Sequence, residues 1–125
     1  MILLDSSVLI ELFRKKNKKD TLFYKISQSE HELSISTVTY YEIGIGNRKS
    51  HAEFWDALCR KLTIIPFDKV CADNAVSIYL NLLHRNKLID LADLLIGATA
   101  VTHKVPIATL NVKHFERINE LDLYQ

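Results

Sequence analysis

Short apolar segments alternate with longer stretches in which apolar residues recur every three or four positions, a pattern that predicts strands and helices in turn. The predicted strands cover residues 1–4, 33–36, 62–67, 105–108 and 121–124. The predicted helices cover residues 6–13, 20–28, 39–47, 51–61, 69–86 and 91–103, with a short one near Phe115. Strands that alternate with helices favour an α/β fold with a central, mainly parallel sheet flanked by helices.

Length and composition predict a single domain over residues 1–125. The hydrophobic fraction of 48% is sufficient for one core and too high for a disordered chain. No apolar run approaches the roughly 18–20 residues that span a bilayer, and the amino terminus lacks the regions of a signal peptide. Cys59 and Cys71 form no CxxC pair or disulfide framework, so we expect a reducing, cytoplasmic location without a membrane partner.

The charge distribution is uneven, although 16 basic and 15 acidic side chains give a formal net charge of only +1. So small an overall charge argues against binding nucleic acid by bulk positive potential. Residues 14–19 nevertheless carry five positive charges in six positions, and without them 11 basic side chains remain against 15 acidic ones. This basic run is either a solvated loop or helix end, or a segment that contacts phosphates.

Three acidic residues occupy comparable places in the predicted elements. Asp5 ends the first strand, at the edge where open parallel sheets bind their ligands. Glu42 follows Thr39 by three positions and Asp93 follows Asp90 by three, so both lie in patterns that open helices, near free backbone N–H groups. If those helix starts face the end of the first strand, the three carboxylates converge.

Each of these acids also has a purely structural explanation when it is taken alone. Glu42 can act as a capping-box residue, and Asp93 as an acid favoured by the helix dipole. Their apolar neighbours argue against this, because an unpaired buried carboxylate is costly. All three glycines follow these acids, at Gly44, Gly46 and Gly97, where each costs a helix about 1 kcal/mol relative to alanine. They predict a close approach of backbone to backbone or to a ligand.

Carboxylates gathered in a dry pocket repel one another, and their pKa values rise unless a cation holds them ionised. Oxygen ligands without a partnering cysteine or histidine favour Mg²⁺ or Mn²⁺ over zinc. The sequence therefore predicts a divalent-cation site made of carboxylates.

The acids and their surroundings fall in four segments, residues 2–12, 36–46, 91–100 and 107–115. The first segment reads ILLDSSVLIEL and the last reads IATLNVKHF. In order and spacing, the four resemble the motifs of PIN-domain ribonucleases, especially the VapC-type toxins of toxin–antitoxin pairs. The resemblance implies a PIN-like three-layer fold and an Mg²⁺-dependent endoribonuclease, the toxin of such a pair, with Mn²⁺ able to replace Mg²⁺.

By this resemblance, Asp5, Glu42 and Asp93 fall on the family's acidic metal-site positions, and Ser7 and Thr109 on its polar pocket positions. All three acids are expected to be catalytic, with Asp5 and Asp93 holding the metal and Glu42 ligating it directly or through water. The cation would lower the pKa of a water molecule and neutralise charge on the scissile phosphate.

At two positions of the fourth motif, this sequence lacks an acidic residue that some relatives carry. Asn111 can ligate a metal or orient a water, as in a subset of relatives, but its amide brings no charge. Either Glu42 or a second ion held with Asn111 is expected to position the attacking water. His114 stands where some relatives carry another acid, and we interpret it as a surface or helix-start residue rather than a catalytic base.

The basic run and the aromatic residues are expected to serve partners. Five side chains would contact RNA phosphates and make binding sensitive to salt: Arg14, Lys15, Lys16, Lys18 and Lys19. Apolar surface that a partner covers is predicted from Phe13, Phe23, Phe54 and Trp55. The resemblance implies a homodimer and a cognate antitoxin protein whose tail enters the groove near the acids.

Two other functions remain open. A non-catalytic interaction protein with a vestigial PIN-like pocket is favoured only by Asn111 in place of an acid. A receiver-like phosphoacceptor domain also places acids at strand ends, but it needs a lysine after a later strand, and Lys104 and Lys113 are poorly placed for it. The sequence contains no phosphate-binding loop, nucleophile elbow, HExxH or cysteine-based zinc pattern.

Overall fold

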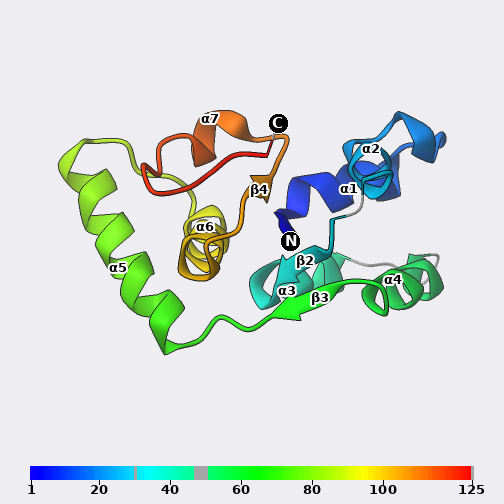
Figure 1. Ribbon diagram of the computed structural model, residues 1–125, viewed down its shortest axis with the longest axis horizontal. Coiled ribbons are helices and arrows are strands. Elements are labelled where there is room, and N and C mark those ends of the chain that lie inside the picture. The colour runs from blue at the N-terminus through cyan, green and yellow to red at the C-terminus, as the bar shows by residue number, and fades with distance from the viewer. Residues whose placement is uncertain (30, 47–50, 125) are drawn as a thin grey trace.

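Four short parallel strands form the central sheet of the computed structural model, which describes residues 1–29, 31–46 and 51–124. The strands, in the spatial order β3-β2-β1-β4, are β1 (Ile2–Leu4), β2 (Leu33–Ser36), β3 (Thr63–Ile65) and β4 (Ile107–Ala108). All neighbouring pairs run parallel, and Leu3 of β1 lies opposite Ser34 of β2 and Ile107 of β4. The predicted parallel sheet is therefore confirmed (Figure 1).

Helices flank this sheet on both sides. In the described residues they are α1 (Ser6–Arg14), the 3₁₀ turn η1 (Lys18–Asp20), α2 (Leu22–Ser27), α3 (Thr37–Gly46), α4 (Ala52–Cys59), α5 (Lys69–His84), α6 (Leu91–His103) and α7 (Val112–Phe115). Figure 1 shows α5 and α6 to the left of the strands and α1, α2 and α4 to the right. None of the helices described is both long and apolar enough to cross a membrane.

Side chains of β1 enter two different cores, because successive residues of a strand point to opposite faces. Leu3 packs in a core with α5, α6 and α7, which includes Ile96. Ile2 and Leu4 pack in a second core with α1, α2 and α4, which includes Leu9. Each β1 residue is at most 1% exposed, so the sheet is an inner layer between two layers of helices.

The glycines have different surroundings in α6 and in α3. A Cβ added at Gly97 of α6 would lie 2.6 Å from Cδ1 of Ile118, so the close approach there is to a side chain and not to backbone, as the first of the two predicted alternatives required. A Cβ at Gly44 or Gly46 of α3 would meet no atom within 4 Å. Within the described residues, the approach of backbone to backbone predicted at these two positions is therefore wrong.

The helix α1 begins at Ser6, as predicted, whereas α3 begins earlier than its sequence signal indicates. Asp5 is the N-cap of α1, because its Oδ1 accepts the backbone N–H of Val8 at 3.4 Å. At the start of α3, Ser36 Oγ accepts the backbone N–H of Val38 at 3.0 Å. Thr39 therefore lies inside α3, and the predicted start there is wrong. The predicted end at residue 47 lies outside the described residues.

Other predicted elements are shorter in the structure. The predicted strand at 121–124 is reduced to one parallel bridge, between Leu123 and Ile107. The predicted helix at 20–28 is divided at Thr21, whose side chain caps α2. One predicted element keeps its full length, because the helix predicted at 91–103 has the same bounds as α6.

Candidate active site

Asp5 lies at the carboxyl end of β1 and is only 1% exposed. Ser7 Oγ donates to its Oδ1 at 2.6 Å, and Thr109 Oγ1 donates to its Oδ2 at 2.8 Å. Burial raises the pKa of Asp5 above its ordinary value; its hydrogen bonds oppose that shift, and the charge of Asp93 adds to it. A buried carboxylate that is repelled by a second one is an arrangement that a bound cation relieves.

Ser7 and Thr109 connect this carboxylate to the segment after β4. Their hydroxyl oxygens lie 3.5 Å apart. Ser7 Oγ accepts the backbone N–H of Leu110 at 3.0 Å, and Thr109 Oγ1 accepts that of Asn111 at 2.8 Å. The structure thus brings both expected pocket residues to Asp5. Asn111 is the N-cap residue of α7, but its side chain makes no capping hydrogen bond, which leaves the amide free of that role.

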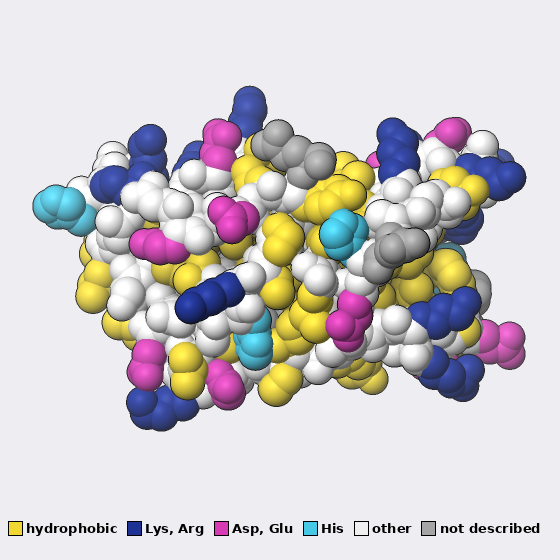
Figure 2. Space-filling model, viewed as in Figure 1, with side chains coloured by type: hydrophobic (Ala, Val, Ile, Leu, Met, Phe, Trp, Pro, Cys, Tyr) yellow, Lys and Arg dark blue, Asp and Glu magenta, His cyan; other side chains and the backbone are white. Residues whose placement is uncertain are grey.

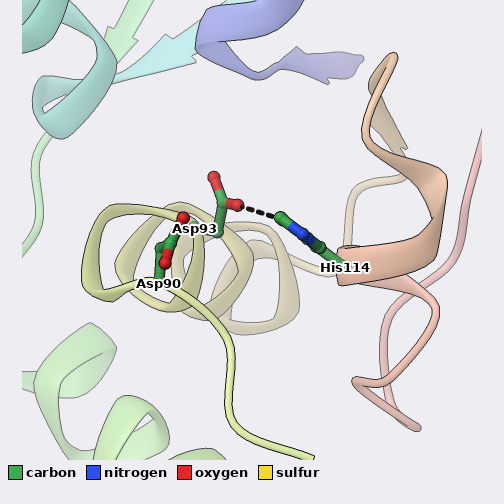
Figure 3. Close-up of side chains that lie close together, drawn as sticks. All are labelled: Asp90, Asp93 and His114. Atoms are coloured by element: carbon green, nitrogen blue, oxygen red, sulfur yellow. Dashed lines mark hydrogen bonds and ion pairs between the residues drawn. The ribbon is translucent and has the colours of Figure 1, made fainter.

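Asp93 lies in the first turn of α6, as predicted, and its Oδ2 is 2.9 Å from Nδ1 of His114 in α7. The Asp93 side chain is 16% exposed and that of His114 is 41% exposed, so water can reach the pair. Asp90 is the N-cap of α6, yet its side chain makes no capping hydrogen bond. Figure 3 shows the three side chains beside the first turn of α6, and their potential ligand atoms lie within 4.8 Å of one another.

His114 and Asp90 are candidate functional residues that sequence reasoning did not assign to the site. The interpretation of His114 as a surface or helix-start residue omits its contact with Asp93, although the side chain is partly exposed. One signal was available for Asp90, because an acid three positions before Asp93 lies on the same side of a helical turn. No comparable signal exists for His114, since 21 residues separate it from its partner.

The side chain of Glu42 is held by a hydrogen bond from Ser6. It lies in the second turn of α3, and its Oε1 accepts Ser6 Oγ at 2.6 Å. Ser6 Oγ also lies 3.2 Å from Thr39 Oγ1. The predicted helix-opening role of Thr39 and Glu42 is therefore wrong, because both lie past the first residues of α3. Glu42 is thus connected to the site through Ser6, the neighbour of Asp5 in the chain.

The basic run is divided between solvent and the end of α1. Lys18 Nζ donates to the backbone carbonyls of Phe13 at 3.3 Å and of Lys15 at 2.7 Å. These carbonyls lie at the end of α1, where the helix dipole favours a cation. Lys18 is therefore turned toward α1, in contrast to the expected RNA contact. Arg14 is exposed and, with Glu42, lines a cavity of about 450 Å³. The remaining lysines of the run, Lys15, Lys16 and Lys19, are also exposed.

Known proteins resemble this chain along almost its full length. A family model for the PIN domain matches residues 2–121. Ribonuclease VapC1 of Methanocaldococcus jannaschii is 34% identical over 129 residues, which cover 98% of this chain and 84% of the relative. Ribonuclease VapC of Rickettsia bellii is 31% identical over 130 residues, which cover 98% and 93%.

Solved structures share the fold. DNA-bound VapBC from Salmonella typhimurium matches with a TM-score of 0.87 at 20% identity, over 98% of this chain and 96% of that one. FitAcB from Neisseria gonorrhoeae matches with a TM-score of 0.81 at 25% identity, over 100% and 97%. With the family model matching residues 2–121 and two relatives above 30% identity, this chain belongs to the PIN-domain family, in its VapC group.

Proposed function

We propose that this chain is an endoribonuclease that hydrolyses RNA phosphodiester bonds with the help of Mg²⁺, or of Mn²⁺ in its place. The observation that carries the proposal is the buried carboxylate of Asp5, held by Ser7 and Thr109 and repelled by Asp93 at the carboxyl end of the sheet. Membership of the PIN family and two relatives named as ribonucleases support the same activity.

The side chains that line the site suit a divalent cation. Asp5, Asp93 and Asp90 offer carboxylate oxygens, which Mg²⁺ and Mn²⁺ both accept. His114 adds a nitrogen within 4.8 Å of the Asp90 and Asp93 oxygens. A bound ion supplies activation of water and neutralisation of the phosphate charge.

In the proposed reaction, each pocket residue has a role that its contacts support. Asp5 and Asp93 hold the cation, and Ser7 and Thr109 fix the orientation of the Asp5 carboxylate. Glu42 acts through water, because Ser6 already holds one of its oxygens. The free amide of Asn111 orients the attacking water or helps to bind a second ion.

RNA cleavage tests the proposal directly. Purified protein should cleave RNA with Mg²⁺ or Mn²⁺ and lose the activity on addition of EDTA. Asp5→Asn and Asp93→Asn should each abolish cleavage, whereas Asp73→Asn should retain it, because Asp73 is exposed and paired with Lys69 on α5. Cleavage that persists in both active-site variants would sink the proposal.

The alternative, an interaction protein with a vestigial pocket, is favoured by Asn111 in place of an acid and by the hydrogen bond that commits one oxygen of Glu42 to Ser6. The two functions differ in cation binding. A working site should raise the midpoint of thermal unfolding on titration with Mn²⁺, because an ion that binds only the folded state stabilises it. An unchanged midpoint at millimolar Mn²⁺, together with no cleavage, would favour the vestigial pocket.

We also propose a cognate antitoxin and a second copy of this chain as partners. Solved relatives of the same fold are described as VapBC complexes and, for Klebsiella pneumoniae, as a toxin–antitoxin complex. Apolar side chains exposed on α3 and at the start of α6 offer surface for such contacts: Tyr41, Ile45 and Leu91. Sedimentation at micromolar concentration tests the dimer, and a monomer there would contradict it.

A further inference from the structure

A basic cleft lies between the turn that joins α5 to α6 and the segment around α7. Its volume is about 600 Å³. Four cationic side chains line it, Arg85, Lys87, Lys113 and Arg117, and Glu116 is the only acid among the lining residues. Together with the basic run, these four account for nine of the 16 basic residues in the chain.

Hydrogen bonds hold the two arginines of this basic cleft in place. Arg117 Nη1 donates to the backbone carbonyl of Leu88 at 2.9 Å, and the guanidinium of Arg85 donates to the backbone carbonyl of Arg117. Arg85 Nε also donates to Oδ1 of Asn81 at 2.9 Å. These bonds go to neutral acceptors, so they fix the position of both guanidinium groups without neutralising their charge.

No carboxylate within the described residues pairs with any of the four cations. The ion pairs there are Lys15–Glu11, Lys69–Asp73 and the Asp93–His114 contact. Four cations that share a cleft with a single acid repel one another, so a folded arrangement that keeps them is suited to an anionic ligand. Four cationic side chains around one cleft favour a ligand with several negative charges over a single small anion.

The basic cleft adjoins the candidate active site along both of its walls. Lys113 precedes His114, whose ring contacts Asp93, and Leu88 lies two residues before Asp90 at the start of α6. Figure 2 shows dark-blue side chains on the left of the upper edge, over the α5–α6 turn and α7, and a second group on the right, over the segment between α1 and α2. A strand of RNA that lies along this edge can therefore meet two separate groups of cations.

We propose that the basic cleft of Arg85, Lys87, Lys113 and Arg117 binds the phosphate backbone of single-stranded RNA beside the cleavage site. This inference rests on the proposed ribonuclease function and adds to it a second phosphate-binding segment, separate from the basic run. The two arginines provide fixed donors for phosphate oxygens, and the two exposed lysines provide mobile charges at the rim.

The test compares two double variants for RNA binding in an Asp5→Asn background, where the proposed cleavage does not consume the probe. Lys87→Gln/Lys113→Gln removes two charges from the cleft, and Lys61→Gln/Lys69→Gln removes two from exposed positions near β3 and at the start of α5. Thermal unfolding checks that all variants fold. Fluorescence anisotropy then gives the affinity for a labelled single-stranded RNA of mixed sequence over a range of salt concentrations.

The cleft variant should bind RNA more weakly at low salt and lose less affinity as salt rises. Two lost phosphate contacts make the slope of log affinity against log salt shallower by about 1.4. Between roughly 50 and 200 mM salt, the cleft variant should therefore lose about sevenfold less affinity than the Asp5→Asn protein. The control variant should keep the slope of the Asp5→Asn protein. Equal slopes for the two double variants would overturn the inference.

Two further measurements separate this inference from its alternatives. Poly-glutamate is compared with unlabelled RNA, at equal charge, as a competitor for the labelled RNA. Equal displacement by the two competitors would mean that the cleft binds an acidic peptide, and would overturn the inference. Cleavage by the chain with Asp5 intact is measured in parallel. If that chain cleaves RNA while the slopes are equal, the proposed function stands and the cleft proposal fails. If it does not cleave but the slopes differ as expected, the cleft proposal stands and the proposed function fails.

Discussion

Thr109 Oγ1 donates a hydrogen bond of 2.8 Å to Oδ2 of Asp5, although 104 positions separate the two residues in the chain. The bond joins the segment after β4 to the end of β1, because these strands are parallel neighbours in the sheet. Parallel strands end at the same edge, so polar residues that follow them meet there. One oxygen of Asp5 is thus held by Thr109 and the other by Ser7, before any cation binds.

Thr109→Val should lower the free energy of unfolding by about 1–2 kcal/mol. Valine keeps the shape of the side chain, but the buried carboxylate of Asp5 loses a donor and the N–H of Asn111 loses its acceptor. Urea denaturation measures the loss. Thr63→Val, which removes an exposed hydroxyl bond to Glu32, serves as the control and should cost less than about 0.5 kcal/mol. Equal losses in the two variants would contradict the prediction.

Asp5→Asn should stabilise the metal-free protein at neutral pH. Burial raises the pKa of Asp5 in the folded chain, so the folded state favours the protonated carboxyl group. The contribution of Asp5 to the free energy of unfolding is full below its pKa in the unfolded chain, about 3.9. That contribution is lost as the pH rises through the raised pKa of Asp5 in the folded chain. Asparagine stays neutral over that range and still caps α1.

Urea denaturation in EDTA at several pH values from about 4 to 7 measures this effect as the difference between Asp5→Asn and the unmodified chain. The difference should grow with pH in favour of the variant. The Asp73→Asn control should show no such growth, because that carboxylate is exposed and paired with Lys69. Curves for Asp5→Asn and the unmodified chain that run parallel with pH would be incompatible with a raised pKa of Asp5.

His114→Ala should weaken Mn²⁺ binding about tenfold, the size of effect typical when a partner of a metal ligand is removed. The side chain contacts Asp93 at 2.9 Å, so its loss leaves that carboxylate without the group that orients it. His114→Asn, whose amide lies close to the position of Nδ1, should retain more of the affinity. Titration followed by thermal unfolding measures both variants without relying on cleavage, and identical affinities for alanine, asparagine and histidine would exclude this role.

Gly97→Ala should destabilise the fold, and Gly44→Ala should stabilise it by about 0.5–1 kcal/mol. A Cβ at Gly97 would lie 2.6 Å from Cδ1 of Ile118, which is itself buried, so the packing must shift. At Gly44 the space is open, and alanine gains helix propensity without a contact. Ile118→Val removes the clashing methyl group, so the double variant Gly97→Ala/Ile118→Val should cost less than the sum of its parts. Additive losses would contradict the proposed clash.

Local sequence patterns were sufficient for the outline of the fold. The alternation of short apolar runs with amphipathic stretches depends on the two-residue period of a strand and the 3.6-residue period of a helix. The order of strands and helices, the bounds of α6 and the place of Asp5 at the end of β1 follow from it. Local patterns predicted the wrong start for α3, at Thr39, because Ser36 caps this helix earlier in the chain.

Residue patterns alone predict an α/β chain whose acids, with Ser7 and Thr109, follow the order of the PIN-family motifs. Which side chains meet is visible only in the folded chain: His114 contacts Asp93, Glu42 accepts a hydrogen bond from Ser6, and four cations from residues 85–117 line one cleft. The physical reason is that these contacts depend on which strands are neighbours and on how helices pack across them. Neither leaves a periodic signal in the chain, because each contact joins residues that are far apart in sequence.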